Sequence, residues 1–398
     1  MAIDTNPEKI EEILTRGVHD VFTRDELRDK LRSGEKLTIK LGTDVTGPNL
    51  HLGHAVVHRK MRDLQELGHD VILIIGDFTT LVGDHSDKID MRAETTREDI
   101  AKNEASYADQ FFRTVHQEQT KIVHNADWFK NLPFSDVIKL TKQYTVQQMF
   151  DRETFKLRFH DGKPIGFDEW MYPLMQGYDS VAIDADVEIG GTDQTFNMLA
   201  GRRLMPVFDK PIQSVIAMKL LTGSDGRPMG KSLKNFIPIM DTATDMYGKL
   251  MGIVDDVIFD YFELLTRIPM DEIESMKESV ARGENPMFFK KRLAREIVTF
   301  YHGEDAAKSA EENFSKTFSN KEIPTDMDVL TVAERSEIPD GLIRFDIVKS
   351  KSEFRRLLEA KAITHLETGE KMLELEDFAE SGSYRIGAHR FIQIVVSS

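Results

Sequence analysis

The spacing of apolar residues in the first half of the chain predicts alternating strands and helices. Short apolar runs at Lys36–Gly42 and Asp70–Asp77 are typical of strands, and the second run is continuous enough for a strand covered on both faces. The segment His51–Gly68 between them carries apolar residues at helical spacing. This strand–helix–strand order predicts a parallel sheet, with a ligand crevice at the carboxyl ends of its strands.

Two later apolar runs extend this predicted sheet. Residues Asp186–Gly191 and Ser214–Leu221 each have the pattern of a strand that ends in a polar loop with glycine. Segment 92–178 has a helical and loop-like pattern, as expected of an insertion in an α/β sheet. We therefore expect residues 1–237 to form a Rossmann-like α/β domain with N-terminal helices and a helical insertion at about 92–178.

The pattern becomes wholly helical after Thr242. An α-helical region is expected from about Asp241 to Phe318, followed by an acidic connection between Pro324 and Pro339. We assign residues 238–335 to this helical domain and its linker.

The last segment, 336–398, has a mixed pattern. Ser350 lies three residues before Glu353, which is the spacing of a capping box at a helix start. Short strand candidates follow at 383–386 and 391–395. This segment is expected to be a small α+β domain.

Composition narrows the chemistry. The 398-residue chain has no cysteine, which excludes disulfides, thiolate nucleophiles and cysteine-ligated metal sites. Its formal net charge of -16 opposes gross attraction to nucleic acid, although a local basic patch can still bind it. The N-terminal residues lack a signal-peptide pattern, and the apolar run Val71–Gly76 is far too short to span a membrane. A cytoplasmic protein without membrane attachment is expected.

Two histidines near a predicted helix start are the first candidates for chemistry. His51 and His54 bracket Gly53, and a helix that begins near Asn49 would hold both imidazoles in its first turn. The N–H groups and partial positive charge of a helix N-terminus suit a phosphate, and Gly53 would let a flat base approach the backbone. From these residues alone, two solvated histidines or a metal pair remain alternatives.

A glycine-rich stretch, Leu220–Asn235, is the second candidate. It follows a predicted strand and places Lys231 and Ser232 at a helix start. A lysine at the end of a mobile loop suits a charge that arrives as negative charge builds on a transferring phosphoryl group. A surface turn with an incidental lysine is the alternative.

The HLGH and PMGKS stretches, in that order on an α/β sheet, resemble the two signature motifs of class I aminoacyl-tRNA synthetases. The strings GDFTTLVGD and YPLMQGYDSVAIDADVEIGGTDQ are similar to tyrosyl-tRNA synthetases of the bacterial type, and SKSEFRRLLEAKAI resembles their C-terminal S4-like RNA-binding domain. The resemblance runs from about Leu37 to the C-terminus. It implies the class I synthetase fold, with a tRNA-binding helical domain on the anticodon side.

The resemblance also implies which residues bind each substrate. The catalytic set would be His51, His54, Lys231, Thr46, Lys88 and Arg92. The ATP contacts would be Thr46, His51, Gly53, His54, Gly191, Asp193, Met229, Lys231 and Ser232, with Mg²⁺ carried by the nucleotide and no metal site in the protein. The tyrosine contacts would be Asp44, Asp84, Tyr172, Gln176, Asp179 and Gln194, of which Asp179 would accept a hydrogen bond from the phenol. The RNA contacts would be Lys351, Arg355 and Arg356.

Structural interpretations compete with these roles when each residue is taken alone. The spacing of Tyr172, Gln176 and Asp179 is also that of an ordinary helix face. The acidic residues that precede or follow glycines could be caps or turn residues, and Lys88 and Arg92 could belong to a solvated charged face. Residues 341–398 carry nine basic and nine acidic side chains, so only clustering on one face would make them bind RNA.

Three positions depart from the pattern of the family. Pro228 replaces the first lysine of the second motif, which leaves Lys231 as its lysine and Arg227 as a substitute cation. Lys40 stands where shorter relatives have a tyrosine that helps to read the phenol, so recognition should depend more on Asp179. His85 and Asp87 alter the loop that carries Lys88.

The resemblance implies a tyrosine–tRNA ligase. Such an enzyme joins L-tyrosine to ATP, giving tyrosyl-adenylate and pyrophosphate, and then transfers tyrosine to the terminal adenosine of tRNA(Tyr) with release of AMP. A homodimer is implied by the same family. The rival hypotheses are a tryptophan-activating relative, an RNA-binding protein on an inactive synthetase scaffold and a generic nucleotidyltransferase.

Overall fold

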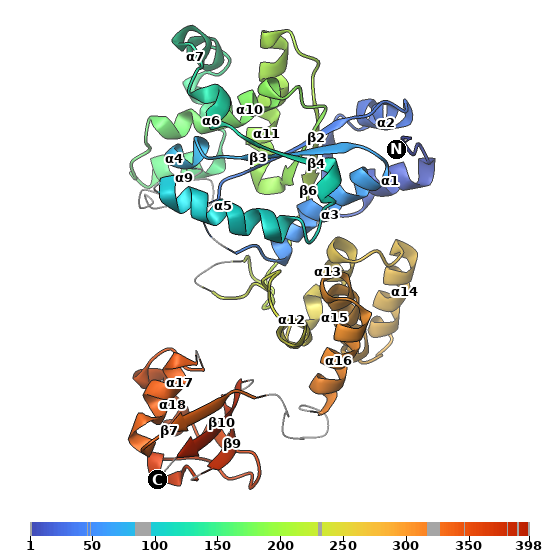
Figure 1. The fold of residues 1–398 in the computed structure, drawn as a ribbon. Helices are drawn as coiled ribbons and strands as arrows, with labels where there is room; N and C mark the ends of the chain where they lie inside the picture. The colour runs from blue at the N-terminus through green and yellow to red at the C-terminus, as the bar shows by residue number, and fades with distance from the viewer. Residues whose placement is uncertain are drawn as a thin grey trace. The chain divides into compact units, whose positions relative to one another are not determined.

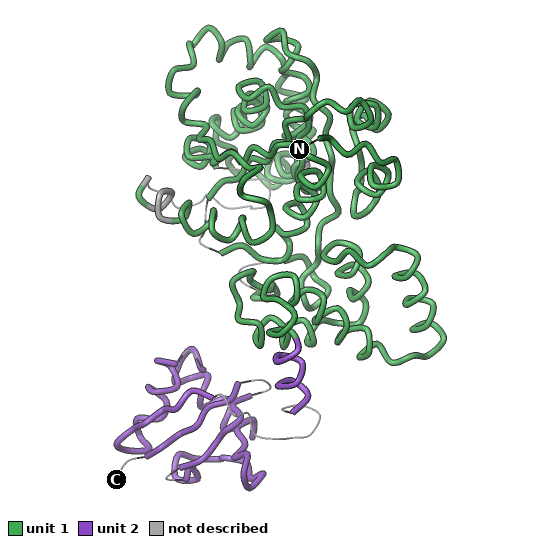
Figure 2. Tube along the Cα trace, turned by 45° about the vertical axis from the view of Figure 1, so that its right-hand side comes forward, with its two compact units in different colours: residues 1–307 green, residues 308–398 purple. Residues whose placement is uncertain are grey.

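The computed structural model describes residues 2–45, 47, 49–83, 97–229, 233–316, 327–345, 347–379, 381–387 and 390–396. The chain divides into two compact units, Met1–Ala307 and Lys308–Ser398 (Figure 2). The first unit contains both the predicted α/β domain and most of the helices that follow it. The finer division at 237 and 335 stays a prediction.

A six-stranded sheet forms the centre of the first unit (Figure 1). Its strands are β1 (Val18–Phe22), β2 (Thr38–Thr43), β3 (Asp70–Ile75), β4 (Thr120–His124), β5 (Val187–Gly191) and β6 (Ser214–Met218). Their order across the sheet is β1-β6-β5-β2-β3-β4. All neighbouring pairs are parallel except β1 and β6, which confirms the predicted parallel sheet.

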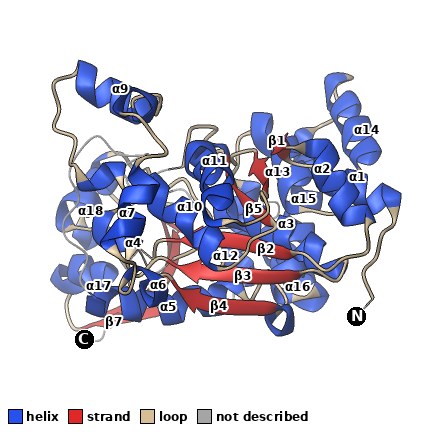
Figure 3. Cartoon of the chain, turned by 90° about the horizontal axis from the view of Figure 1, so that it is seen from above, coloured by secondary structure: helices blue, strands red, loops and turns tan. Residues whose placement is uncertain are grey.

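The strand order reverses between β2 and β5. From β2 the chain proceeds to β3 and β4 on one side, whereas β5 and β6 lie on the other. The connections therefore leave in opposite directions at this point, which opens a crevice outside the carboxyl ends of β2 and β5. Those ends lie on the side of the sheet where α4, α6 and α10 are found (Figure 3).

The expectation that segment 92–178 contains only helices and loops was wrong. It holds β4, which pairs with β3 and forms one edge of the sheet. The opposite edge is β1, in a region where only helices were expected. Both are edge strands, and β4 is only partly buried, so neither needs the continuous apolar run that marks a central strand.

Helices cover both faces of this sheet. In Figure 1, α10 and α11 lie above the strands and α3 and α5 below them. The helices that precede α12 are α1 (Pro7–Thr15), α2 (Arg24–Arg32), α3 (Leu52–Glu66), α4 (Thr79–Val82), α5 (Arg97–Phe111), α6 (Ala126–Phe129), α7 (Phe134–Thr141), α8 (Val146–Met149), α9 (Glu153–His160), α10 (Tyr172–Ala182) and α11 (Thr195–Leu204).

The predicted helical region is present after residue 242. It comprises α12 (Ala243–Met251), α13 (Ile258–Leu265), α14 (Met270–Ala281), α15 (Pro286–His302) and α16 (Glu304–Phe314). Buried apolar residues of α13 and α15, among them Phe262 and Leu293, give this region its core, and α13 packs against α3. Among the described helices, none is both long enough and apolar enough to cross a membrane.

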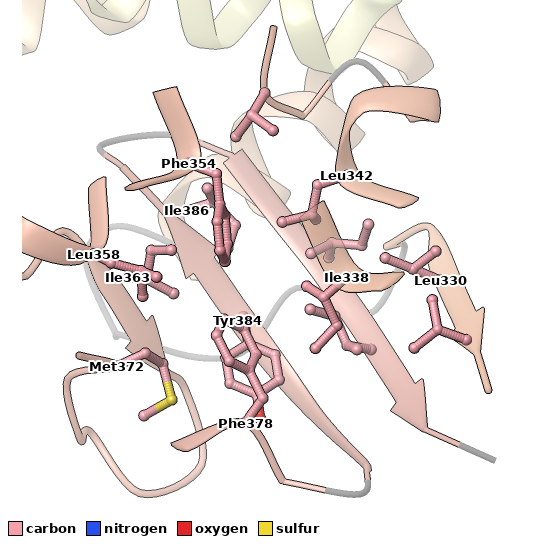
Figure 4. Packing of buried hydrophobic residues seen from close by; sticks show 14 residues of the cluster. Leu330, Ile338, Leu342, Phe354, Leu358, Ile363, Met372, Phe378, Tyr384 and Ile386 are labelled. Carbon is pink, nitrogen blue, oxygen red and sulfur yellow. The ribbon is translucent and has the colours of Figure 1, made fainter. Parts of the chain in front are cut away.

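The second unit is built around a four-stranded sheet of order β7-β10-β9-β8. Its strands are β7 (Val329–Val332), β8 (Ile363–His365), β9 (Ser381–Ile386) and β10 (Arg390–Val396), and its helices are α17 (Ile338–Arg344) and α18 (Lys351–Glu359). Phe354 of α18 packs with Phe378 and Tyr384 in its core (Figure 4). The mixed α+β pattern is thereby confirmed.

Two details of the terminal segment differ from expectation. The predicted acidic connection between Pro324 and Pro339 contains β7, whose Leu330 and Val332 are buried in the core. Ser350 caps α18 by accepting from the Glu353 N–H at 3.2 Å, as predicted. The Glu353 carboxylate, however, accepts from the N–H of Lys349 rather than that of Ser350, at 2.7 Å.

Candidate active site at the carboxyl ends of the parallel strands

A cavity of about 260 Å³ lies at the carboxyl ends of β2, β3 and β5, where the strand order reverses. Its walls come from the strand ends, from α10 and from the segment after β5. Of the predicted site residues, it brings together Asp44, Tyr172, Gln176, Asp179, Asp193 and Gln194. The histidine motif, Gly191 and Met229 are not part of its lining.

Asp44 stands at the end of β2 and is held from two sides. The Tyr172 hydroxyl donates to Asp44 Oδ2 at 3.0 Å, and the Thr79 hydroxyl donates to Oδ1 at 2.9 Å. Thr79 in turn accepts from the side-chain amide of Asn125 at 3.0 Å. A Cβ atom at Gly76 would overlap the Asp44 and Thr79 side chains, so glycine at this position leaves room for their hydrogen bond. The network therefore orients the carboxylate at the cavity wall.

Asp179 is 3 % exposed and lies on the same helix as Tyr172. The Trp128 indole N–H donates to its Oδ1 at 2.9 Å, and Asn125 Nδ2 lies 3.5 Å from its Oδ2. Burial raises the pKa of Asp179 to about 7, against the opposing effects of the Lys40 charge and of these donors. Asp179 is thus a buried acceptor that titrates near neutral pH.

A cluster of buried polar groups lies beneath the cavity. Lys40 of β2 and Glu188 of β5 form an ion pair at 2.9 Å. The Lys40 ammonium also donates to the Gln176 carbonyl and to the Ser180 hydroxyl, each at 2.7 Å. Glu188 accepts from Gln176 Nε2 at 3.2 Å and from Gln213 Nε2 at 2.6 Å. These contacts fasten α10 to the two strands that flank the crevice.

Asp193 and Gln194 form the opposite rim. Asp193 is exposed at the mouth, and Gln194 Nε2 lies 3.3 Å from Asp193 Oδ2. Gln194 is held by Asn197, whose side-chain amide donates to Gln194 Oε1 at 2.9 Å. A Cβ at Gly191 would overlap Asp193 and Leu220, so the backbone passes close to both side chains.

His51 and His54 cap α3. The helix begins at Leu52, later than expected, and His51 is its N-cap. Nδ1 of His51 accepts from the Gly53 N–H, and Nδ1 of His54 accepts from the His51 N–H, each at 3.2 Å. In a neutral ring whose Nδ1 accepts, the proton lies on Nε2. Both imidazoles therefore present an N–H donor from Nε2 at the start of a helix.

The segment that follows the second motif pairs with the first motif. Leu52 donates to the Ile237 carbonyl, and Ile239 donates to the Leu50 carbonyl, each at 3.0 Å. A Cβ at Gly53 would lie 3.0 Å from the Met229 sulfur, so the Met229 side chain packs against this glycine. The chain thus brings Met229 and the segment near Ile237 next to HLGH, although they are far apart in sequence.

Six predicted site residues fall outside the described part of the chain, and their roles stay predictions. These are Thr46, Asp84, Lys88, Arg92, Lys231 and Ser232.

The predicted RNA-binding residues lie on α18 of the second unit. Lys351, Arg355 and Arg356 are exposed, whereas Phe354 and Leu358 on the other face are buried. Lys351 pairs with Asp340 at 2.8 Å. The separation of a basic and an apolar face on this helix agrees with the sequence pattern.

Sequence reasoning missed two residues of the cavity lining, Thr79 and Glu188, and two residues that hold Asp179, Asn125 and Trp128. Thr79 belongs to the GDFTT string, but Asn125 and Trp128 follow β4, the strand that was not predicted. Glu188 was included in the predicted strand Asp186–Gly191 without a role. Recognition of β4 would have placed Asn125 at a strand end, which is the signal that could have identified it.

Comparison with known proteins gives a consistent family. Residues 32–319 match the family model "tRNA synthetases class I (W and Y)". Tyrosine–tRNA ligase from Thermotoga maritima is 42 % identical over 393 residues, which cover 98 % of both chains. The Carboxydothermus hydrogenoformans enzyme of the same name is 42 % identical over 402 residues, covering 96 % of this chain and 97 % of that one.

A solved structure agrees on the fold. The C-terminally truncated mitochondrial tyrosyl-tRNA synthetase of Aspergillus nidulans matches with a TM-score of 0.65 and 24 % identity. The match covers 78 % of this chain and 94 % of that one. The family model covers most of the chain, and the identity to bacterial relatives extends over nearly its whole length. The chain therefore belongs to the class I tRNA synthetases of the tryptophan and tyrosine group, and within it to the bacterial tyrosine–tRNA ligase family.

Proposed function

We propose that this protein activates L-tyrosine with ATP and transfers it to tRNA(Tyr). The observation that carries the proposal is the cavity at the strand-order reversal, which has a buried carboxylate at one end and polar groups at its mouth. Tyrosine has the complementary shape, with a phenol at one end and an ammonium and a carboxylate at the other. The 42 % sequence identity to tyrosine–tRNA ligases, which extends over nearly the whole chain, supports the same substrate.

In this assignment the phenol lies at Asp179. Its carboxylate is held by Trp128 and Asn125 and would accept the phenol hydrogen. The ammonium lies near Tyr172 and Gln176, with Asp84 as a predicted further contact, and Gln194 orients the substrate carboxylate. A site with a buried acceptor penalises a ligand that lacks the matching donor, so phenylalanine should be excluded.

ATP binds across the start of α3 in this proposal. The Nε2–H groups of His51 and His54 and the helix N-terminus suit phosphate oxygens, while Asp193 suits the ribose. Thr46, Lys88, Arg92, Lys231 and Ser232 are proposed to complete the phosphate contacts, and Gly53, Gly191 and Met229 the nucleotide site. Mg²⁺ bound to the nucleotide would neutralise part of the phosphate charge.

The reaction needs no general base for its first step. The tyrosine carboxylate attacks the α-phosphorus, the bond to the pyrophosphate breaks, and tyrosyl-adenylate forms. The ribose hydroxyl of the terminal adenosine then attacks the activated carbonyl, and AMP leaves. Catalysis is therefore mainly positioning, together with stabilisation of charge on phosphate oxygens by His51 and Lys231.

The proposal extends to the partners of the chain. Lys351, Arg355 and Arg356 on α18 are proposed to contact tRNA by backbone charge. A homodimer through the insertion is supported by apolar side chains there that are largely exposed, including Phe134 at 76 %, Phe159 at 69 % and Phe167 at 87 %. A cytoplasmic location is proposed with the function.

Aminoacylation tests this proposal. Purified protein, ATP, labelled tyrosine and a tRNA(Tyr) transcript should yield acid-precipitable tyrosyl-tRNA, and omission of ATP should abolish it. A transcript that lacks its terminal adenosine is the matched control. Absence of charging with an intact bacterial tRNA(Tyr), in protein that unfolds cooperatively, would contradict the proposal.

A further inference from the structure

A second cavity, of about 190 Å³, lies away from the active site between α1, α3 and α13. Its walls include apolar side chains from all three helices and a group of charged residues. The apolar lining residues of interest are Ile13, Val56 and Leu264, and the cations are Arg59 and Lys60. The space exceeds the roughly 30 Å³ that one water occupies in the liquid, so it can hold a small molecule.

Two adjacent cations on α3 line this cavity and are almost completely buried. Arg59 is 7 % exposed and Lys60 is 3 % exposed. The Arg59 guanidinium lies over the Phe300 ring, 4.3 Å from its centroid, and donates no hydrogen bond to any described residue. The Lys60 ammonium donates to the Ile13 carbonyl at 2.8 Å and pairs with no carboxylate among the described residues.

The acidic residues of the same cavity are already paired with other cations. Asp63 contacts Arg267, and Glu66 pairs with Arg267 at 2.6 Å. Glu12 pairs with Arg16 at 3.1 Å, and Glu263 pairs with Lys219 at 2.8 Å. Arg59 and Lys60 are therefore the two positive groups of the lining that form no salt bridge in the described chain, although the nearby charge of Asp63 acts on both.

Burial of these two cations is unfavourable without an anion. It lowers the pKa of Lys60 to about 8 and that of Arg59 to about 10, because the charged forms lose water. Buried charges in proteins are ordinarily paired. An anion in the cavity would supply the absent partner, and a planar carboxylate matches the donor fork of a guanidinium.

We propose that this cavity is a binding site for a small organic anion: a carboxylate with a short apolar tail, bound by Arg59 and Lys60. The carboxylate would accept from both side chains, and the tail would lie against Ile13, Val56 and Leu264. A bound molecule would bridge α1, α3 and α13, and α3 is the helix whose N-cap is His51. The proposal is independent of the proposed function.

Calorimetric titration of the full chain with isovalerate tests it. Saturating L-tyrosine is present throughout, so that the proposed amino-acid site cannot take up the probe. We expect saturable binding of one molecule per chain, with a Kd below about 10 mM. Isovaleramide has the same shape without the charge and should bind at least about tenfold more weakly. Lack of saturable isovalerate binding, or equal binding of the amide, would overturn the proposal.

Variants locate the site. The double variant Arg59→Met/Lys60→Met should lose isovalerate binding by about tenfold or more. Arg62→Met is the matched control, because Arg62 lies on the same helix and near the same Phe300 ring but outside the cavity lining. Its affinity for isovalerate should equal that of the parent chain.

A second variant protects the test against a folding defect. Leu264→Phe keeps both cations but fills the place of the tail, and it should weaken isovalerate binding while the melting temperature shows a folded chain. Loss of binding in both variants but not in Arg62→Met supports the site. Unchanged affinity in the double variant would place the probe elsewhere and refute it.

Discussion

The ammonium of Lys40 lies 2.9 Å from a carboxylate oxygen of Glu188, and neither side chain is more than 2 % exposed. The two residues are also register partners of β2 and β5, the strands between which the crevice opens. Through Gln176 and Ser180 the same pair holds α10, which carries Asp179. Lys40 thus positions the wall of the cavity. It therefore has a structural role, although the family resemblance implied only that a phenol contact is lost at this position.

Replacement of Lys40 by methionine should strongly destabilise the first unit. It leaves Glu188 buried without its cation, which should lower the free energy of unfolding by about 3–5 kcal/mol. The double variant Lys40→Met/Glu188→Met should be less destabilised than Lys40→Met, because no unpaired charge remains. Both tryptophans, Trp128 and Trp170, belong to the first unit, so urea unfolding followed by tryptophan fluorescence measures the effect.

Lys36→Met is the matched control for this prediction. Lys36 is half exposed and pairs with Asp70 at 3.0 Å, so its loss should change the free energy of unfolding by less than about 1 kcal/mol. Equal stabilities of Lys40→Met and Lys36→Met would mean that the buried pair does not stabilise the fold.

Tyrosine affinity should depend on pH through Asp179. The pKa of this buried acid is raised to about 7, so the acceptor becomes ionised as the pH rises through that value. Binding of tyrosine without ATP should tighten over the range from about pH 6 to about pH 8, because a carboxylate accepts the phenol hydrogen more strongly than its acid form does. Equilibrium dialysis with labelled tyrosine measures this.

Asp179→Asn should remove that pH dependence and weaken tyrosine binding by about tenfold or more.

The same raised pKa predicts that the free energy of unfolding changes with pH in the opposite direction to tyrosine affinity. Protonated Asp179 favours the folded state, so its contribution is complete below about pH 4 and is lost as the pH rises towards 7. A parent enzyme whose tyrosine affinity is flat across neutral pH would contradict the role of this carboxylate.

Gly76→Ala should damage tyrosine binding more than it damages the fold. An added Cβ would push against Asp44 and Thr79 and break their hydrogen bond, which should cost about 1–3 kcal/mol in binding free energy. Gly248→Ala is the control, since a Cβ there meets no atom within 4 Å and Gly248, on α12, is not part of the cavity lining. Tyrosine dissociation constants of the two variants provide the comparison, and equal values would exclude a specific role for Gly76.

Two substitutions at His51 separate capping from catalysis. His51→Asn keeps a side-chain acceptor for the start of α3, whereas His51→Ala removes it and should cost about 1 kcal/mol of stability. Both should slow adenylate formation by about tenfold to a hundredfold, because both remove the imidazole donor. Stopped-flow measurement of adenylate formation tests this, and a normal rate in His51→Asn would assign His51 to capping alone.

The central strands and the two motifs could be predicted because their signals are local. β2, β3, β5 and β6 are apolar runs, and the helix after β2 has a strong periodicity. The edge strands β1 and β4 could not be predicted in this way, because a strand with only one neighbour in the sheet is less buried and carries fewer apolar residues. The failure at β4 also hid Asn125 and Trp128, which follow that strand and hold the Asp179 carboxylate.

The burial of Lys40 was equally beyond prediction. A lysine in a strand ordinarily faces solvent, and its partner Glu188 is 148 residues away in the sequence. Only the pairing of β2 with β5 brings the two charges together. The contact of Met229 with Gly53 is similar, because it depends on how the segment near Ile237 pairs with the start of α3.

The central claim is that the cavity at β2 and β5 activates tyrosine, and pyrophosphate exchange tests it most directly. Amino-acid-dependent incorporation of labelled pyrophosphate into ATP is measured with tyrosine, tryptophan and phenylalanine in turn. We predict rapid exchange with tyrosine and at least about a hundredfold less with phenylalanine, which cannot donate a hydrogen bond to Asp179. Exchange that is faster with tryptophan, or absent with all three amino acids, would contradict it.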